Sequence, residues 1–202
     1  RSYRYDFDNE INDLLPGLQD TSSSKGFLAR FTMASDSKKK KWTYILGLEN
    51  YYEHGTGTRL MDSTATNSGE AYTNDLGIFG SGKINVSNVL TLQSGARFTY
   101  NMRYGTAVTP STWLLWQPKL PFQLKTSWAY GFRSPAIKEL FFSFIDVNHY
   151  VIGNPNLKPE RSVNLRSELT WKTIKMDKTQ VTLTATGFYN IVNDRIILTA
   201  LG

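Results

Sequence analysis

Cysteine is absent from this chain of 202 residues, and histidine occurs only as His54 and His149. Without cysteine there is no disulfide bridge, no thiolate metal site and no cysteine nucleophile. The sequence contains no Cys/His spacing typical of zinc sites, no nucleophile-elbow glycine pattern and no phosphate-binding glycine loop. We therefore expect a protein that is not an enzyme and has no intrinsic cofactor.

Long apolar runs are lacking as well. A transmembrane helix needs about 20 consecutive apolar residues, and no such run occurs. The N-terminus shows no signal-peptide pattern. Because Arg1 already lies in what reads as strand sequence, we expect the chain to be a fragment of a longer protein.

Charge is modest and scattered along the chain. The formal net charge is +6, and the positive residues gather only at Lys38–Lys41. That cluster follows a polar stretch, so a solvated turn explains it better than a nucleic-acid surface does. No nucleic-acid partner is expected.

The abundant pattern is alternation of apolar and polar residues in segments of about ten residues. In the segment 89–100, Leu90 and Phe98 fall on the apolar face and Arg97 falls on the polar face. This period of two is typical of a sheet with one apolar and one polar side. About ten residues is also the length of a tilted strand that crosses a membrane.

The alternation predicts an all-β fold, an antiparallel meander of about ten strands in which sequential neighbours pair. Short connections at 35–40, 83–87, 119–122 and 174–178 alternate with long ones at 8–24, 53–69 and 132–160. The connections 103–108 and 192–194 are also short, although strict alternation places them at the same rim as the long connections. Short turns on one rim and longer loops on the other are typical of an outer-membrane barrel. The predicted strands are 2–7, 25–34, 41–52, 70–82, 88–102, 109–118, 123–131, 161–173, 179–191 and 195–201.

Aromatic side chains are frequent where the predicted strands meet the connections. Amphipathic rings at strand ends suit the two membrane–water interfaces of a barrel, although tyrosine and tryptophan also favour strands in general. The residues concerned are Tyr51, Tyr52, Tyr72, Tyr100, Tyr104, Trp113, Trp116, Trp128, Tyr130, Trp171 and Tyr189.

Two proline-containing boxes bracket the longest loop, Phe132–Pro135 at its start and Asn154–Glu160 at its end. The pair resembles the boxes of the TonB-dependent receptors, large outer-membrane β-barrels that import iron chelates, haem or cobalamin. Weaker likenesses in family order, at 46–51, 90–98 and 184–196, extend the resemblance over residues 41–198. The first box here is Phe132, Arg133, Ser134 and Pro135, and the second comprises Asn154, Pro155, Asn156, Leu157, Lys158, Pro159 and Glu160.

The resemblance implies a location and a function. Residues 1–202 would form part of a large transmembrane β-barrel in the outer membrane of a Gram-negative bacterium, without the plug domain and the C-terminal strands of the family. The full receptor would bind an iron–siderophore complex, haem or cobalamin at its extracellular loops and import it with energy from TonB. Its partners would be outer-membrane lipid and the TonB complex, which acts through the plug. A surface lipoprotein partner is compatible with this scaffold.

The boxes contain candidate structural and ligand-binding residues. Arg133 can pair with Glu139 or Glu160 and fix the base of the loop, or it can contact the ligand directly. Pro135 restricts the residue before it to extended geometry, and the Asn154–Pro155 pair favours a turn. A structural role is the preferred interpretation of both boxes.

The two histidines are candidate ligand-binding residues. His149 lies between the boxes beside Tyr150, where haem-importing members of the family carry an axial histidine, so it is a candidate iron ligand for transported haem. A plain loop residue is the alternative. His54, in the long loop after Tyr52, is a second candidate.

Two other functions remain open from the sequence. A soluble, lectin-like β-sandwich would bury the apolar faces in its interior and would not need detergent. An outer-membrane barrel enzyme is disfavoured by the missing nucleophile set. Detergent dependence distinguishes the sandwich from the barrel, and hydrolase assays test the enzyme.

Overall fold

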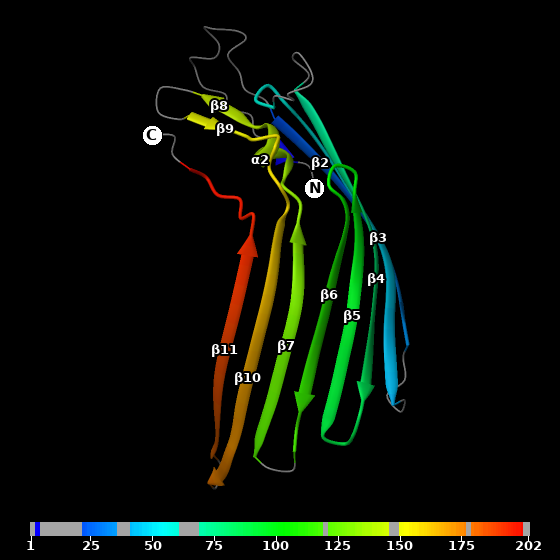
Figure 1. Ribbon diagram of the computed structural model, residues 1–202, viewed down its shortest axis with the longest axis vertical. Helices are drawn as coiled ribbons and strands as arrows, with labels where there is room; N and C mark the ends of the chain where they lie inside the picture. The colour runs from blue at the N-terminus through cyan, green and yellow to red at the C-terminus, as the bar shows by residue number, and fades with distance from the viewer. Residues whose placement is uncertain are drawn as a thin grey trace.

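The computed structural model places the chain in one long antiparallel sheet (Figure 1). It describes residues 3–4, 22–35, 41–60, 69–118, 121–145, 150–176 and 179–199. Nine strands pair in the order β1-β2-β3-β4-β5-β6-β7-β10-β11, so the predicted all-β antiparallel meander is confirmed. The strands are β1 (Tyr3–Arg4), β2 (Ser22–Ala34), β3 (Trp42–Gly57), β4 (Glu70–Asn85), β5 (Leu90–Asn101), β6 (Gly105–Trp116), β7 (Phe122–Arg133), β10 (Glu160–Met176) and β11 (Thr179–Asn193).

The connections divide between the two ends of the sheet (Figure 1). The connections 35–41, 86–89, 117–121 and 177–178 join strands at one end. The connections 58–69, 102–104 and 134–159 join them at the other end, which we call the loop rim. Of the five connections that the sequence analysis assigns to the long-loop rim, those predicted at 53–69, 103–108 and 132–160 lie there. Within the described residues, no helix is long and apolar enough to cross a membrane.

One face of the sheet is apolar and exposed. The strand register places Phe31, Leu48, Ile78 and Phe98 in one row across β2 to β5. Their exposed fractions are 66%, 51%, 57% and 53%. Soluble monomers rarely expose contiguous apolar patches larger than a few hundred Å², and no second sheet covers this face in the described part of the chain. The arrangement therefore does not fit a soluble β-sandwich.

The opposite face of the sheet is polar. Arg30 of β2 and Arg97 of β5 both donate hydrogen bonds to the Glu49 carboxylate on β3. Arg97 passes over β4 at Gly77, where a Cβ atom would lie 2.8 Å from its Nη2 atom. The polar face is therefore tied together across four strands by a charged network that a side chain at Gly77 would block.

Some of the aromatic residues near strand ends lie on the apolar face, as a membrane interface requires, and others lie on the polar face. At the short-turn end, the ring of Phe122 lies 5.5 Å from that of Trp116 and 6.4 Å from that of Trp171. All three residues belong to the apolar face by strand register. Trp113, in contrast, pairs with Ser127 on the polar face. The alternation of side chains along each strand therefore decides which rings lie on the apolar face. A position near a strand end does not decide it.

The loop between the two boxes contains short elements that the sequence did not predict. They are α2 (Ile137–Phe141), β8 (Ser143–Ile145) and β9 (Tyr150–Ile152), with β8 and β9 paired in a small separate hairpin. Elements of three to five residues are too short for a periodic pattern to develop. Their formation depends on contacts with the rim of the sheet.

The predicted strand 195–201 is wrong over residues 195–199, which do not belong to the sheet. Asp194 adopts the left-handed conformation with φ of 53° and turns the chain away from the strand direction. The next amides are then free for other acceptors, and the Ile196 N–H donates to the Glu160 carboxylate at 2.7 Å. Residues 200–202 lie outside the described residues, as do residue 2 and residues 5–7 of the predicted first strand.

Candidate functional site

The loop between the boxes folds back onto the polar face at the loop rim. Ile137, Leu140 and Phe141 of α2 form a buried cluster with Leu60 and Ala71. Ala71 shares the polar face of β4 with Gly77, because the two residues are an even number of positions apart. These five residues are the buried apolar residues of the described chain. The loop is thus held inward over the side of the sheet that carries the charges.

Arg133, the last residue of β7, joins both boxes to α2. Its Nε atom donates to Glu160 Oε2 at 2.7 Å, and its Nη1 atom donates to Glu139 Oε2 at 2.9 Å. Both pairings proposed from the sequence are therefore present at once. Glu160 also accepts the Ile196 N–H, so one arginine links the end of β7, the start of β10, α2 and the segment after β11.

Glu139 lies in the first turn of α2, outside the strands. Burial alone would raise the pKa of its carboxyl group. Hydrogen bonds from Arg133 and from the Ala136 N–H, at 2.7 Å, outweigh burial and hold the pKa of Glu139 below its usual range. The carboxylate therefore stays charged and paired at neutral pH.

The second box forms a compact turn. The Asn154 side chain accepts the Asn156 N–H at 2.9 Å, and its carbonyl accepts the Leu157 N–H at 3.2 Å. The Asn154 N–H in turn donates to the Glu139 carbonyl at 2.9 Å. At Gly153 a Cβ atom would lie 2.7 Å from the carbonyl carbon of Leu140, so only glycine allows the box to approach α2 this closely. The second box is therefore held against α2 by backbone and side-chain hydrogen bonds.

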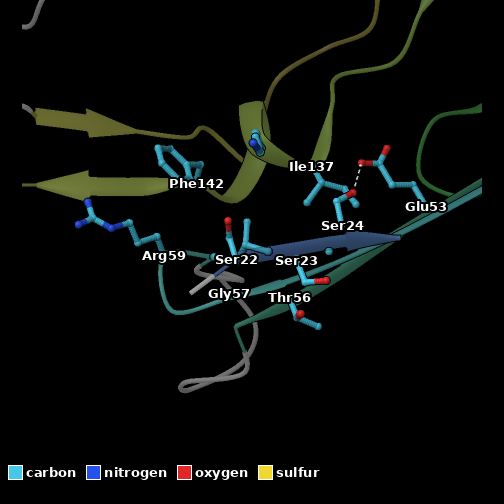
Figure 2. A pocket seen from close by; sticks show the side chains of 12 residues that line it. Ser22, Ser23, Ser24, Glu53, Thr56, Gly57, Arg59, Ile137 and Phe142 are labelled. Atoms are coloured by element: carbon cyan, nitrogen blue, oxygen red, sulfur yellow. Dashed lines mark hydrogen bonds between the residues drawn. The ribbon is translucent and has the colours of Figure 1, made fainter. Parts of the chain in front are cut away.

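A cavity of about 230 Å³ lies beside α2 at the loop rim (Figure 2). Leu60, Ile137 and Phe142 supply its apolar wall. Hydroxyl groups and charged side chains surround them, and Ser24 donates a hydrogen bond to Glu53 at 3.0 Å, drawn as a dashed line. Apolar walls with a few polar groups are typical of small-molecule sites. The polar lining residues are Ser22, Ser23, Ser24, Glu53, Thr56, Arg59 and Lys138.

A second hollow, of about 570 Å³, lies on another side of the same short helix. It is bounded by the second box and by the segment Ile196–Thr199. Lys138 of α2 and Leu157 of the second box both line it. The loop between the boxes therefore contributes to both hollows, and its position fixes the shape of each.

His149 lies outside the described residues. His54 does not line the cavity, and it belongs to β3, not to the long loop predicted from the sequence. His54 pairs in register with Tyr72 on the apolar side of the sheet, and its Nε2 atom lies 2.5 Å from Glu70 Oε1. Tyr150 begins β9, and its side chain lies outside the described part. Among the described residues, no group of three or more histidine or acidic side chains is placed to hold a metal ion.

Other residues at the rim were not identified from the sequence. Glu53, Ser24 and Lys138 line the first cavity, and Arg103 contacts the loop from the β5–β6 connection. None of them stands in a motif. Their proximity depends on strand register and on the inward folding of the loop, and a single sequence shows neither.

A family model described as "TonB dependent receptor-like, beta-barrel" matches residues 1–202. Among curated proteins, the chain is 28% identical over 107 residues to an "Iron-regulated outer membrane virulence protein" of Vibrio cholerae serotype O1. That match covers 52% of this chain and 16% of the relative. The chain therefore spans only a small part of the curated protein it matches.

Solved structures share the fold. The ferric enterobactin receptor PfeA (mutant G324V) of Pseudomonas aeruginosa matches with a TM-score of 0.68 and 17% identity, over 85% of this chain and 27% of the receptor. The siderophore receptor PirA of the same organism matches with a TM-score of 0.64 and 16% identity, over 85% and 32%. The FrpB iron transporter of Neisseria meningitidis matches with a TM-score of 0.60 and 14% identity, over 88% and 30%.

Proposed function

This chain belongs to the TonB-dependent receptor family, as part of its β-barrel, and from that premise we propose that it helps an outer-membrane receptor to bind and import an iron chelate. The family match over residues 1–202 is the observation that carries the proposal. Members of this family reside in the outer membrane of Gram-negative bacteria. We infer that the apolar face of the sheet lies toward lipid in that membrane.

The proposed mechanism is capture, without covalent chemistry. Iron chelates would enter from the outside and contact side chains at the loop rim. The inward loop between the boxes supports this role, since it places apolar and charged groups around the cavity beside α2. At about 230 Å³ this cavity is smaller than typical sites for whole ligands, so it would hold one arm of a larger chelate.

Iron is the favoured cargo because of the relatives. The curated relative is named as iron-regulated, and the structural neighbours are named as receptors for ferric enterobactin, receptors for siderophores, or iron transporters. Release of the cargo inward would use energy supplied by TonB through the plug domain of the full-length protein. Haem remains a second cargo to test, because His149 lies between the boxes where the family's haem importers carry a histidine.

Equilibrium binding to the purified full-length receptor tests the proposal. Ferric catecholate and ferric hydroxamate chelates, their iron-free forms and haem are titrated separately, with protein fluorescence or the Soret band as the signal. We expect saturable binding of one ferric chelate at micromolar concentration or below. Binding of none of the iron compounds would contradict the proposal.

Two pairs of variants locate the binding. Ser22→Trp fills the mouth of the cavity beside α2 and should weaken chelate binding, whereas Ser87→Trp, in the exposed turn at the opposite end of the sheet, should not. If haem binds, loss of its spectral shift in His149→Ala but not in His54→Ala would assign His149 as the iron ligand. Haem binding that both variants retain would remove that assignment.

A further inference from the structure

Arg103 connects the β5–β6 turn to the loop between the boxes at two points. Its Nη2 atom donates to the Pro155 carbonyl in the second box at 2.8 Å. Its guanidinium carbon lies 5.1 Å from the centroid of the Phe141 ring at the end of α2. A hydrogen bond from a charged donor and a cation over an aromatic ring are both among the stronger non-covalent contacts. Arg103 thus contacts the loop between the boxes both at the end of α2 and at the second box.

The turn that carries Arg103 is itself fixed. The Asn101 side chain is 1% exposed, and its Oδ1 atom accepts the N–H groups of Arg103 and Tyr104 at 2.9 and 3.0 Å. Its Nδ2 atom donates to Asp75 Oδ1 at 2.5 Å on the neighbouring strand β4. Arg103 therefore projects from a preorganised base, and less conformational entropy is lost when it engages the loop.

The contacts of Arg103 bear directly on the cavity wall. Phe141 is 7% exposed and belongs to the buried cluster that includes Ile137 and Leu60. Ile137 and Leu60 also line the cavity, together with Phe142, the residue after Phe141. Figure 2 shows the side chains of Ile137 and Phe142 beside the cavity. A shift of Phe141 would therefore move the wall of the cavity.

We propose that Arg103 is a positioning residue that holds the loop between the boxes inward and so keeps the cavity beside α2 in the shape that binds ligand. Arg103 does not line the cavity, so it acts through Phe141 and Pro155. The effect on ligand binding rests on the proposed function. The effect on the position of the loop does not, because the contacts are made without ligand.

Hydrogen exchange in the ligand-free, full-length receptor tests the loop directly. The amides of Leu140, Phe142, Gly153 and Asn154 donate to carbonyls within the loop and report on its order. Arg103→Gln should speed their exchange by about 30-fold or more, the size expected for losing one charged hydrogen bond and one cation–π contact. Arg103→Lys, which keeps a cation and a donor, should restore most of the protection. Arg161→Gln, at an exposed arginine on β10, is the matched control.

Ligand binding gives the second readout. Arg103→Gln should raise the Kd of the ferric chelate roughly three- to tenfold. Phe141→Leu should have an effect that is not additive with Arg103→Gln, since both changes remove the same contact.

Three results would overturn the proposal. The first is wild-type exchange at the four loop amides in Arg103→Gln. The second is faster exchange throughout β5 and β6, which would make Arg103 a support of the sheet. The third is a faster-exchanging loop with an unchanged Kd. If the wild-type receptor binds no ferric chelate while the loop loosens as expected, the proposed function fails and the positioning of the loop by Arg103 stands.

Discussion

At the scale of single residues, the polar face depends on positions that have no side chain. Gly77 lets Arg97 reach Glu49 across an intervening strand. Gly95 allows a close approach of two strands, since a Cβ atom there would lie 2.6 Å from the Gly80 carbonyl oxygen. Backbone atoms of a paired strand cannot move aside easily. Glycine is therefore required at these positions by close packing, and not by a positive φ angle.

Alanine substitutions at Gly95 and Gly82 should have different effects on the free energy of unfolding. Gly95→Ala should destabilise the full-length receptor by about 1–3 kcal/mol, because the new methyl group overpacks the sheet. Gly82→Ala meets nothing within 4 Å and should be neutral or stabilise by about 0.4–1 kcal/mol through the unfolded state. Urea unfolding of the receptor in lipid vesicles measures both. Equal effects of the two changes would contradict this reading of the strand packing.

The ion pair between Arg133 and Glu139 predicts a pH dependence of the loop. Because the pKa of folded Glu139 lies below the usual value of 4.5, the pair contributes stability that is fully present above about pH 4.5. That contribution is lost as the pH falls through the lowered pKa. Half-exposed ion pairs contribute only about 0–1 kcal/mol, so the effect should be confined to the loop.

A fluorophore on Lys158→Cys of the full-length receptor can follow this change. Its anisotropy should be constant between pH 8 and pH 5 and should fall below pH 4.5. In Arg133→Gln the anisotropy should already be low at pH 7 and should change little on acidification. A transition centred near pH 6, or no difference between the two proteins, would argue against the ion pair as the cause.

At the scale of elements, alternation was a reliable guide to the strands and a poor one to everything between them. It located β3, β4, β5, β7, β10 and β11 to within a few residues. It missed α2, whose five residues have no period of their own. It also predicted a separate strand at 195–201, after Asp194, whose positive φ ends the ladder. The pairing of Arg133 could be predicted because its partners stand in or beside the boxes. The contacts of Arg103 could not, because they depend on how the loop folds back.

Adjacent residues in the middle of β11 test which face meets lipid. Ala185 pairs with Leu169 on the apolar face, and Thr186 pairs with Glu168 on the polar face. In the full-length receptor, Ala185→Lys should cost about 2–4 kcal/mol of folding free energy in lipid vesicles, the cost of a lysine at the bilayer midplane. Thr186→Lys should cost little, because the new charge faces Glu168. Similar costs for both would mean that the two faces do not differ in environment.

At the scale of the whole molecule, the described strands form a sheet that does not close on itself. The strand order runs from β1 to β11 without a pairing between the ends, and β11 is exposed along the length described from Val181 to Asn193. Unpaired edges of long strands pair readily with other chains. A surface that is apolar on one side and polar on the other adds a second reason to associate.

The 202-residue segment expressed alone should therefore not behave as a stable monomer. Refolded in detergent micelles, it should give a broad range of oligomers in sedimentation velocity, whereas the full-length receptor should give one species. A compact monomer of the segment in plain buffer would contradict the assignment of the apolar face to lipid.

A spin-label scan along β11 of the full-length receptor in lipid vesicles tests the central claim most directly. Labels at Val181, Leu183 and Ala185 should collide frequently with oxygen dissolved in the lipid, and labels at Thr182, Thr184 and Thr186 should not. The account predicts this alternation with a period of two and with the apolar positions in contact with lipid. Absence of alternation, or apolar positions that neither oxygen nor a water-soluble nickel chelate can reach, would show that these side chains pack inside the protein and would contradict it.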